Sequence, residues 1–140
     1  MRSVIKYGLF CVLTFSMVVL TAFGQALPEG KWQLVEYSFH NKIAHPISGI
    51  AITMNVDGKG AIGGKSGCNV YGGSYAVDNG KLKITDIIST QMFCDDSSNQ
   101  FEHDYFAMLT AATAVKLDTG TLTISDAKTK RFLKFTKLKS

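Results

Sequence analysis

The stretch IAITMNVDGKGAIGGK, residues 50–65, indicates the fold most directly. Apolar side chains occupy every second position over residues 50–56, so one face of a strand is expected to be buried. The pair Asp57-Gly58 supplies the positive backbone φ that tight hairpin turns need. A partner strand should follow over residues 61–65, where two glycines predict a bend or bulge. The inward residues of the first strand would be Ile50, Ile52, Met54 and Val56.

Short alternating segments of the same kind lie on both sides of this stretch. Turn residues such as Asp78-Asn79-Gly80 separate them, which is typical of antiparallel β-structure. The segment from His40 to Pro46 is expected to be a loop or an edge, because proline has no amide proton for a sheet. Strands are predicted over residues 31–37, 50–56, 61–65, 70–77, 81–85, 114–117, 121–125 and 131–138.

One segment has helical periodicity instead. Apolar residues recur at helical spacing over residues 101–112, which predicts one amphipathic helix from about Ser98 to Ala112. Ser97 and Gln100 are expected to form its capping box. The acids around its start are predicted to cap the helix and solvate its outer face, rather than to perform acid/base chemistry or bind calcium loosely. These acids are Asp95, Asp96, Glu102 and Asp104.

Residues 1–24 read as a secretory signal. Arg2 and Lys6 precede an uncharged apolar block, which ends in Ala22-Phe23-Gly24. Cleavage after Gly24 is preferred to cleavage after Ala26. An uncleaved anchor is the alternative, although the block is shorter than the roughly 20 apolar residues of a membrane-spanning helix. The expected domains are a signal peptide, 1–24, and a periplasmic or secreted domain, 25–140.

Removal of the signal changes the charge and the cysteine count. Without Arg2 and Lys6 the formal charge falls from +4 to about +2, too little to suggest nucleic acid as the main partner. Cys11 also leaves, so Cys68 and Cys94 remain as an expected disulfide in an oxidising compartment. It would close a loop of about 27 residues and stabilise the fold by roughly 3–4 kcal/mol.

Other chemistries have weaker support in the sequence. A redox-active pair would normally be Cys-x-x-Cys, which is absent, and no spacing supports a zinc site built from both cysteines and two of His40, His45 and His103. His103 and Asp104 are adjacent helical residues that point in different directions. The glycines over residues 60–73 lack the ending of a phosphate-binding loop. We therefore predict no enzyme, catalytic residue, cofactor or metal site.

Two sequence blocks carry a family resemblance. The first is Ser66-Gly67-Cys68-Asn69-x-Tyr71-x-Gly73-x-Tyr75, and the second is Ser89-Thr90-x-Met92-x-Cys94. Together they resemble the META/HslJ-like domain of bacterial exported proteins, and the similarity covers nearly all of the chain after the signal. Weaker matches are Trp32-x-Leu34, a helix with Glu102, Tyr105 and Leu109, and the closing strands Leu122-x-Ile124 and Leu133-x-Phe135.

The resemblance implies a small, partly open β-barrel, calycin- or lipocalin-like, wrapped around one helix. It also implies an envelope location, and an association with heat-shock or antibiotic-tolerance phenotypes in some relatives. No catalytic activity follows from it. Many bacterial relatives are lipoproteins, whereas here Cys11 lies inside the apolar block and Gln25, not a cysteine, directly follows Gly24.

Two functions are consistent with these features. The first is a disulfide-locked, monomeric scaffold that supports stress tolerance by contacting an unidentified envelope component. The alternative is a carrier of a small apolar ligand or lipid, since a barrel of about eight strands either fills itself or holds one small ligand. A weaker third is an inhibitor or adhesion module acting through residues 40–46. The cavity of a carrier would be lined by residues such as Ile52, Met54, Tyr75 and Met108.

Six positive charges gather in the last thirteen residues. We expect them to mark a solvated edge strand whose lysines block edge-to-edge pairing. The alternative is weak contact with an anionic membrane surface. The residues are Lys128, Lys130, Arg131, Lys134, Lys137 and Lys139.

Overall fold

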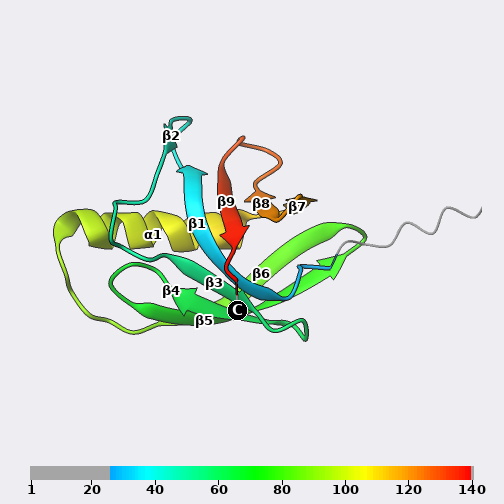
Figure 1. The fold of residues 1–140 in the computed structure, drawn as a ribbon, viewed down its shortest axis with the longest axis horizontal. Helices are drawn as coiled ribbons and strands as arrows, with labels where there is room; N and C mark the ends of the chain where they lie inside the picture. The colour runs from blue at the N-terminus through cyan, green and yellow to red at the C-terminus, as the bar shows by residue number, and fades with distance from the viewer. Residues whose placement is uncertain (1–25, 140) are drawn as a thin grey trace, which may run out of the picture.

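A computed structural model describes residues 26–139, and the proposed signal peptide lies outside them. Within this range the chain forms nine strands and one helix (Figure 1). That helix is not both long and apolar enough to cross a membrane. The elements are β1 (Gly30–Ser38), β2 (Ile43–Ala44), β3 (Thr53–Val56), β4 (Ala61–Lys65), β5 (Val70–Asp78), β6 (Lys81–Ser89), α1 (Asp96–Ala111), β7 (Ala114–Asp118), β8 (Thr121–Ser125) and β9 (Phe132–Lys137).

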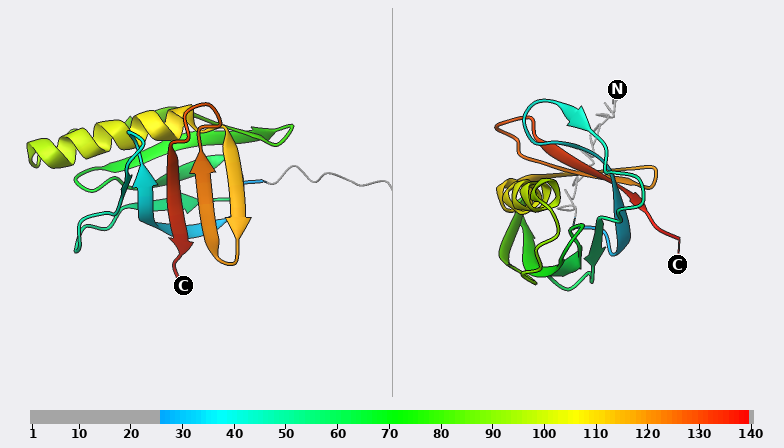
Figure 2. Two further views of the ribbon diagram at one scale, coloured as in Figure 1. Left: turned by 90° about the horizontal axis from the view of Figure 1, so that it is seen from above. Right: turned by 90° about the vertical axis from the view of Figure 1, so that its left-hand side faces the viewer.

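The strands form one antiparallel sheet that curls into a half-barrel. Its order is β6-β5-β4-β3-β1-β9-β8-β7, with the short β2 paired to β1. The two ends of the sheet approach each other, and the backbone amide of Leu82 donates to the carbonyl of Thr113 across the seam at 2.9 Å. Helix α1 fills the open side between β4–β6 and β7–β9 (Figure 2). The predicted partly open barrel with one late helix is confirmed.

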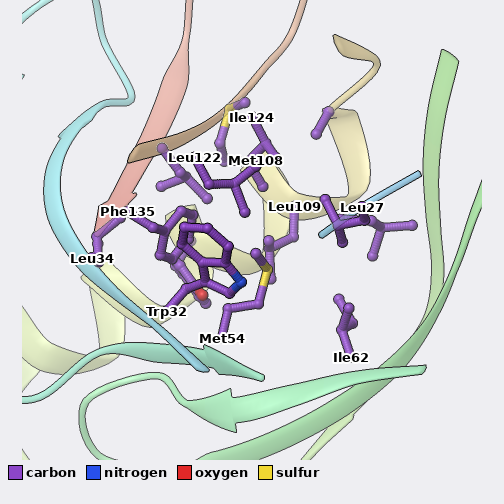
Figure 3. Close-up of a cluster of buried hydrophobic side chains, with 14 of the residues drawn as sticks. Leu27, Trp32, Leu34, Met54, Ile62, Met108, Leu109, Leu122, Ile124 and Phe135 are labelled. Carbon is purple, nitrogen blue, oxygen red and sulfur yellow. The ribbon is translucent and has the colours of Figure 1, made fainter. Parts of the chain in front are cut away.

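The core lies between the concave face of the sheet and α1 (Figure 3). Trp32 from β1 and Met54 from β3 meet Met108 and Leu109 from the helix, and all four are at most 1% exposed. Burial of such side chains stabilises a fold by roughly 1.5–3 kcal/mol each. The helix is therefore a structural part of the barrel interior.

The prediction for Ile50 is wrong. Its side chain is 37% exposed, and β3 begins only at Thr53, although Ile52, Met54 and Val56 are buried as expected. Gly49 has a φ of 87°, in the left-handed region that favours glycine. This turn takes the preceding segment away from the sheet before the strand begins.

The prediction of an edge strand at the C-terminus is also wrong. Strand β9 lies inside the sheet, paired on one side with β1 and on the other with β8. Its lysines are therefore not needed to protect an edge. Lys134 pairs with Glu36 at 3.7 Å, and the ammonium of Lys137 lies 5.7 Å from the centre of the Trp32 ring.

Strand β6 is longer than the predicted 81–85. It continues to Ser89 past an irregularity opposite Gly72–Ser74, where Asp86 has a φ of 56°. This β-bulge lets the strand bend and continue, so β5 and β6 stay paired from Asp78 and Lys81 to Tyr71 and Ser89.

Gly64 is required by close packing between β3 and β4. A Cβ atom at this position would overlap the carbonyl oxygen of Thr53, which is backbone and cannot move aside cheaply. We expect Gly64→Ala to lower the free energy of unfolding by about 1–3 kcal/mol or more, as overpacking does. Gly72→Ala is the matched control, because a Cβ there meets only the Ile62 carbonyl oxygen, at 3.8 Å. Urea denaturation of both variants tests this, and equal stabilities would contradict it.

Candidate functional site

Three loops meet beside the N-terminal end of α1, at one end of the barrel (Figure 1). They are residues 45–52 before β3, residues 66–69 between β4 and β5, and residues 90–95 before the helix. The second and third contain the two sequence blocks that carry the family resemblance. We call this end of the molecule the motif pole.

A disulfide joins two of these loops. Cys68 and Cys94 are bonded, with their Cα atoms 6.0 Å apart. Cys68 is half-buried and Cys94 is exposed. The bond occupies both sulfurs, so the thiolates that a zinc site would need are already used. Within residues 26–139 there is also no group of three His, Cys, Asp or Glu side chains arranged to hold a metal ion.

Glu102 joins the helix to the loop 66–69. Its carboxylate is almost buried, at 9% exposure, and accepts from the Ser66 hydroxyl, from the Asn69 backbone amide at 3.2 Å and from the Asn69 side-chain amide at 2.7 Å. Three donors thus replace the water that the carboxylate loses on burial. The prediction that Glu102 solvates the outer face of the helix is wrong.

The burial of Glu102 follows from helical spacing. It precedes Tyr105 by three residues and Leu109 by seven, so it lies on the same face as these buried side chains. Spacing alone does not single out Glu102, because Asp104 lies four residues before the buried Met108 and meets the same criterion. Asp104 lies farther round the helix, where it is 3.4 Å from His40.

Asn69 extends the network to the third loop. Its side-chain oxygen accepts from the Thr90 hydroxyl at 2.7 Å and from the backbone amide of Met92 at 2.8 Å. Its side-chain nitrogen also donates to the Met92 carbonyl at 3.1 Å. One buried asparagine therefore holds the segment that leads to Cys94. The disulfide and these hydrogen bonds connect the same two loops, residues 66–69 and 90–95.

Asp95, not Ser97, is the N-cap of α1. Its carboxylate accepts from the backbone amide of Ser98 at 2.9 Å and from the hydroxyls of Ser97 and Ser98. These hydrogen bonds hold the pKa of Asp95 at about 2, because they favour its charged form. The helix thus begins at Asp96, two residues earlier than predicted.

A buried tyrosine pair lies deeper behind the motif pole. The hydroxyls of Tyr71 and Tyr105 are 2.8 Å apart, and Tyr71 also donates to the Thr53 carbonyl at 3.2 Å. Burial raises the pKa of both hydroxyls well above the ordinary value for tyrosine. Both therefore stay protonated and serve as hydrogen-bonding groups of the core.

The surface of the motif pole is apolar. A pocket of about 200 Å³ lies between loop 45–52 and the helix start, with Ile50, Gly67 and Phe101 in its wall. Ile47 in this wall is 66% exposed, and on the loop 90–95 of the same pole Met92 is 57% exposed and Phe93 75%. Exposed apolar groups gathered at one place are typical of a contact surface.

The other residues considered in the sequence lie apart from this arrangement. His40 contacts Asp104, whereas the Nδ1 atom of His45 is 2.9 Å from the Val35 carbonyl oxygen. His103 is exposed on the helix. Of the residues expected to line a carrier's cavity, Ile52, Met54 and Met108 are buried in the packed core and Tyr75 packs against it.

The matched region decides the family. The model of the META domain family matches residues 25–139, which is the whole part of the chain described above and most of its length. The chain belongs to the META domain family. A search of curated proteins found no match.

Solved structures share the fold of this META domain protein. An NMR structure of a protein from Burkholderia xenovorans is 26% identical, with a TM-score of 0.69, and the match covers 84% of this chain and 87% of that one. A DUF4847 family protein from Bacteroides vulgatus is 15% identical with a TM-score of 0.54, over 80% of this chain and 94% of that one. The second likeness shows the fold alone. Neither description names a catalytic activity.

Proposed function

We propose that this META domain protein is an exported, non-enzymatic scaffold whose motif pole contacts another envelope component and thereby supports stress tolerance. The observation that carries the proposal is that exposed apolar side chains lie on loops held in place by a disulfide and by buried hydrogen bonds. Phe93 is 75% exposed, and it precedes a disulfide-bonded cysteine. A preorganised contact surface loses less conformational entropy when a partner binds.

The chemistry of the motif pole supports a role in binding rather than catalysis. The buried carboxylate of Glu102 is saturated with donors from Ser66 and Asn69, and both sulfurs are oxidised. Each group that could act as an acid, base or nucleophile in this network already has a structural partner. Such groups stabilise loops well but are poorly placed to exchange protons with a substrate.

Core packing favours the scaffold over carriage of a ligand inside the barrel. Met54 and Met108, two residues that would line such a cavity, are 0% exposed and contact the aromatic and aliphatic core (Figure 3). Ile52 is the exception, since it also contributes to the wall of the pocket at the motif pole. A small apolar ligand would therefore more readily find space at this pole than in the barrel interior.

Complementation in the host tests the proposal. A strain that lacks the gene should survive heat or envelope stress poorly, and the wild-type chain should restore survival. Phe93→Ser should fail to restore it, whereas Leu117→Ser, which changes a 48% exposed side chain on β7, should succeed. Both purified variants should melt like the wild type, because neither side chain is buried.

The same strains test export and contact. The chain recovered from the envelope should begin at Gln25, and a photo-crosslinker at position 93 should yield a specific adduct that one at position 117 does not. Restoration of survival by Phe93→Ser, or recovery of the chain in the cytoplasm with residues 1–24 retained, would contradict the proposal.

A further inference from the structure

A trough crosses the outer face of the sheet, on the side opposite the core. Two adjoining hollows of about 460 and 340 Å³ share Val70 and Tyr71 in their walls. Both volumes are within the roughly 300–1,000 Å³ that is usual for small-molecule sites. The first hollow lies over β1, β3 and β4, and the second lies over β5 and β6.

The two ends of the trough differ in chemistry. Lys31 and Lys65 line the first hollow together with the polar side chains of Gln33 and Asn55. The second hollow is lined by Ile88, which is 75% exposed, and by Val70, which is 50% exposed. A ligand that matched both ends would carry a polar anionic group and an apolar segment.

The positive charge of the first hollow is not compensated by the protein. No acidic residue lines either hollow. Among residues 26–139 the salt bridges of the basic side chains involve His40, Arg131 and Lys134, and neither Lys31 nor Lys65 takes part in one. An anion placed between these two lysines would thus gain an interaction that the folded chain leaves unused.

The middle of the trough is kept open by a glycine that the fold does not require. Gly72 pairs with Gly63 across the strands and with Ile88 on the other side. Its φ is outside the left-handed region, and a Cβ atom would be in ordinary contact, 3.8 Å from the Ile62 carbonyl oxygen. Glycine weakens a strand interior, and it is often found where a ligand approaches the backbone closely.

We propose that this trough binds a single-chain anionic amphiphile, with the anionic head group between Lys31 and Lys65 and the apolar chain over Gly72 toward Val70 and Ile88. The ligand is a free molecule, not the surface of a bilayer, because the cations and the apolar side chains lie along one trough. This site is separate from the pocket at the motif pole and does not depend on the proposed contact function.

Titration with dodecyl phosphate tests the proposal. In ¹⁵N NMR spectra of the exported chain, the amides of Gly63, Gly72 and Ile88 should shift at concentrations below the micelle threshold. Inorganic phosphate and dodecyl maltoside should each produce much weaker shifts, because each lacks one half of the ligand. Equal shifts with dodecyl maltoside, or shifts confined to the residues of the motif pole, would overturn the proposal.

Three variants separate charge from shape. Lys31→Gln with Lys65→Gln should weaken binding about 10-fold or more, because each cation contributes to attraction of an anion. The matched control, Lys128→Gln with Lys130→Gln, removes the same charge from the β8–β9 loop and should bind like the wild type. Gly72→Val should fold normally, since β-branched residues suit strands, and lose binding by filling the trough.

The remaining outcomes also decide the matter. If Gly72→Val leaves binding unchanged, the ligand does not lie in the trough and the proposal is wrong. If both double lysine variants weaken binding equally, the ligand is held by general charge attraction, which also overturns the proposal. Binding to phosphatidylglycerol vesicles without any shift by dodecyl phosphate would overturn it in favour of a membrane surface.

Discussion

Replacing Cys68 or Cys94 with Ser is expected to lower the free energy of unfolding by roughly 3–4 kcal/mol. The disulfide closes a loop with a sequence separation of 26, and its loss restores conformational freedom to the unfolded chain. For a domain of typical stability, about 5–15 kcal/mol, this is a large share. Urea denaturation followed by circular dichroism measures the change, and the double variant should be no less stable than either single one.

Reduction provides the matched control for the disulfide. Dithiothreitol should bring the wild-type chain to the stability of the variants, and it should leave the double variant unchanged. The bonded form also predicts that the exported protein has no reactive thiol at either position. If both cysteines react freely with a thiol reagent in the folded, exported protein, the assignment of a stabilising disulfide is wrong.

Local patterns in the sequence were sufficient for most of the fold. Alternation identified the strands, and turn pairs such as Asp57-Gly58 identified the hairpins, because both signals act over a few residues. The bond between Cys68 and Cys94 could be anticipated from the cysteine count. The family resemblance then supplied the curvature of the sheet, which no local pattern contains.

Errors arose where long-range pairing decides the outcome. The lysines of β9 suggested an edge, but an edge is defined by which strands pair, and β9 lies between β1 and β8. The error at Ile50 has a local cause, because a turn at Gly49 directly precedes this first residue of the alternating pattern. The contact between Asn69 and Glu102 joins residues 33 positions apart, so only the fold could reveal what the acid binds.

The trough is a further feature of this kind. Lys31 and Lys65 belong to different strands, and their shared hollow appears only when β1, β3 and β4 are placed side by side. In the sequence, Gly72 is one of several glycines over residues 60–73, and nothing there sets it apart. Only the neighbouring backbone shows that no steric contact requires glycine at this position.

Replacing Glu102 with Ala is expected to cost roughly 2–6 kcal/mol of stability, since it leaves the backbone amide of Asn69 and one proton of its side-chain amide without an acceptor. Leaving a buried polar group unpaired costs about 1–3 kcal/mol, so two unpaired donors are costly. The Ser66 hydroxyl keeps an acceptor, because the Asn69 carbonyl oxygen lies 3.0 Å away. Urea denaturation of the variant gives the change directly. Asn69→Ala should cost a similar amount, and the double variant should cost less than the two single changes together, because both remove the same hydrogen bonds.

Glu36→Ala is the control for the removal of a glutamate. Its carboxylate lies 3.7 Å from Lys134 near the surface, and such pairs contribute about 0–1 kcal/mol. The loss of stability in Glu102→Gln should lie between those of Glu102→Ala and Glu36→Ala. The glutamine side chain keeps one oxygen as an acceptor, but its NH₂ group would face the donors of Asn69. If Glu102→Ala costs no more than Glu36→Ala, the hydrogen bonds of Glu102 do not hold the motif pole together. The rigidity proposed for its apolar surface would then have to come from the disulfide alone.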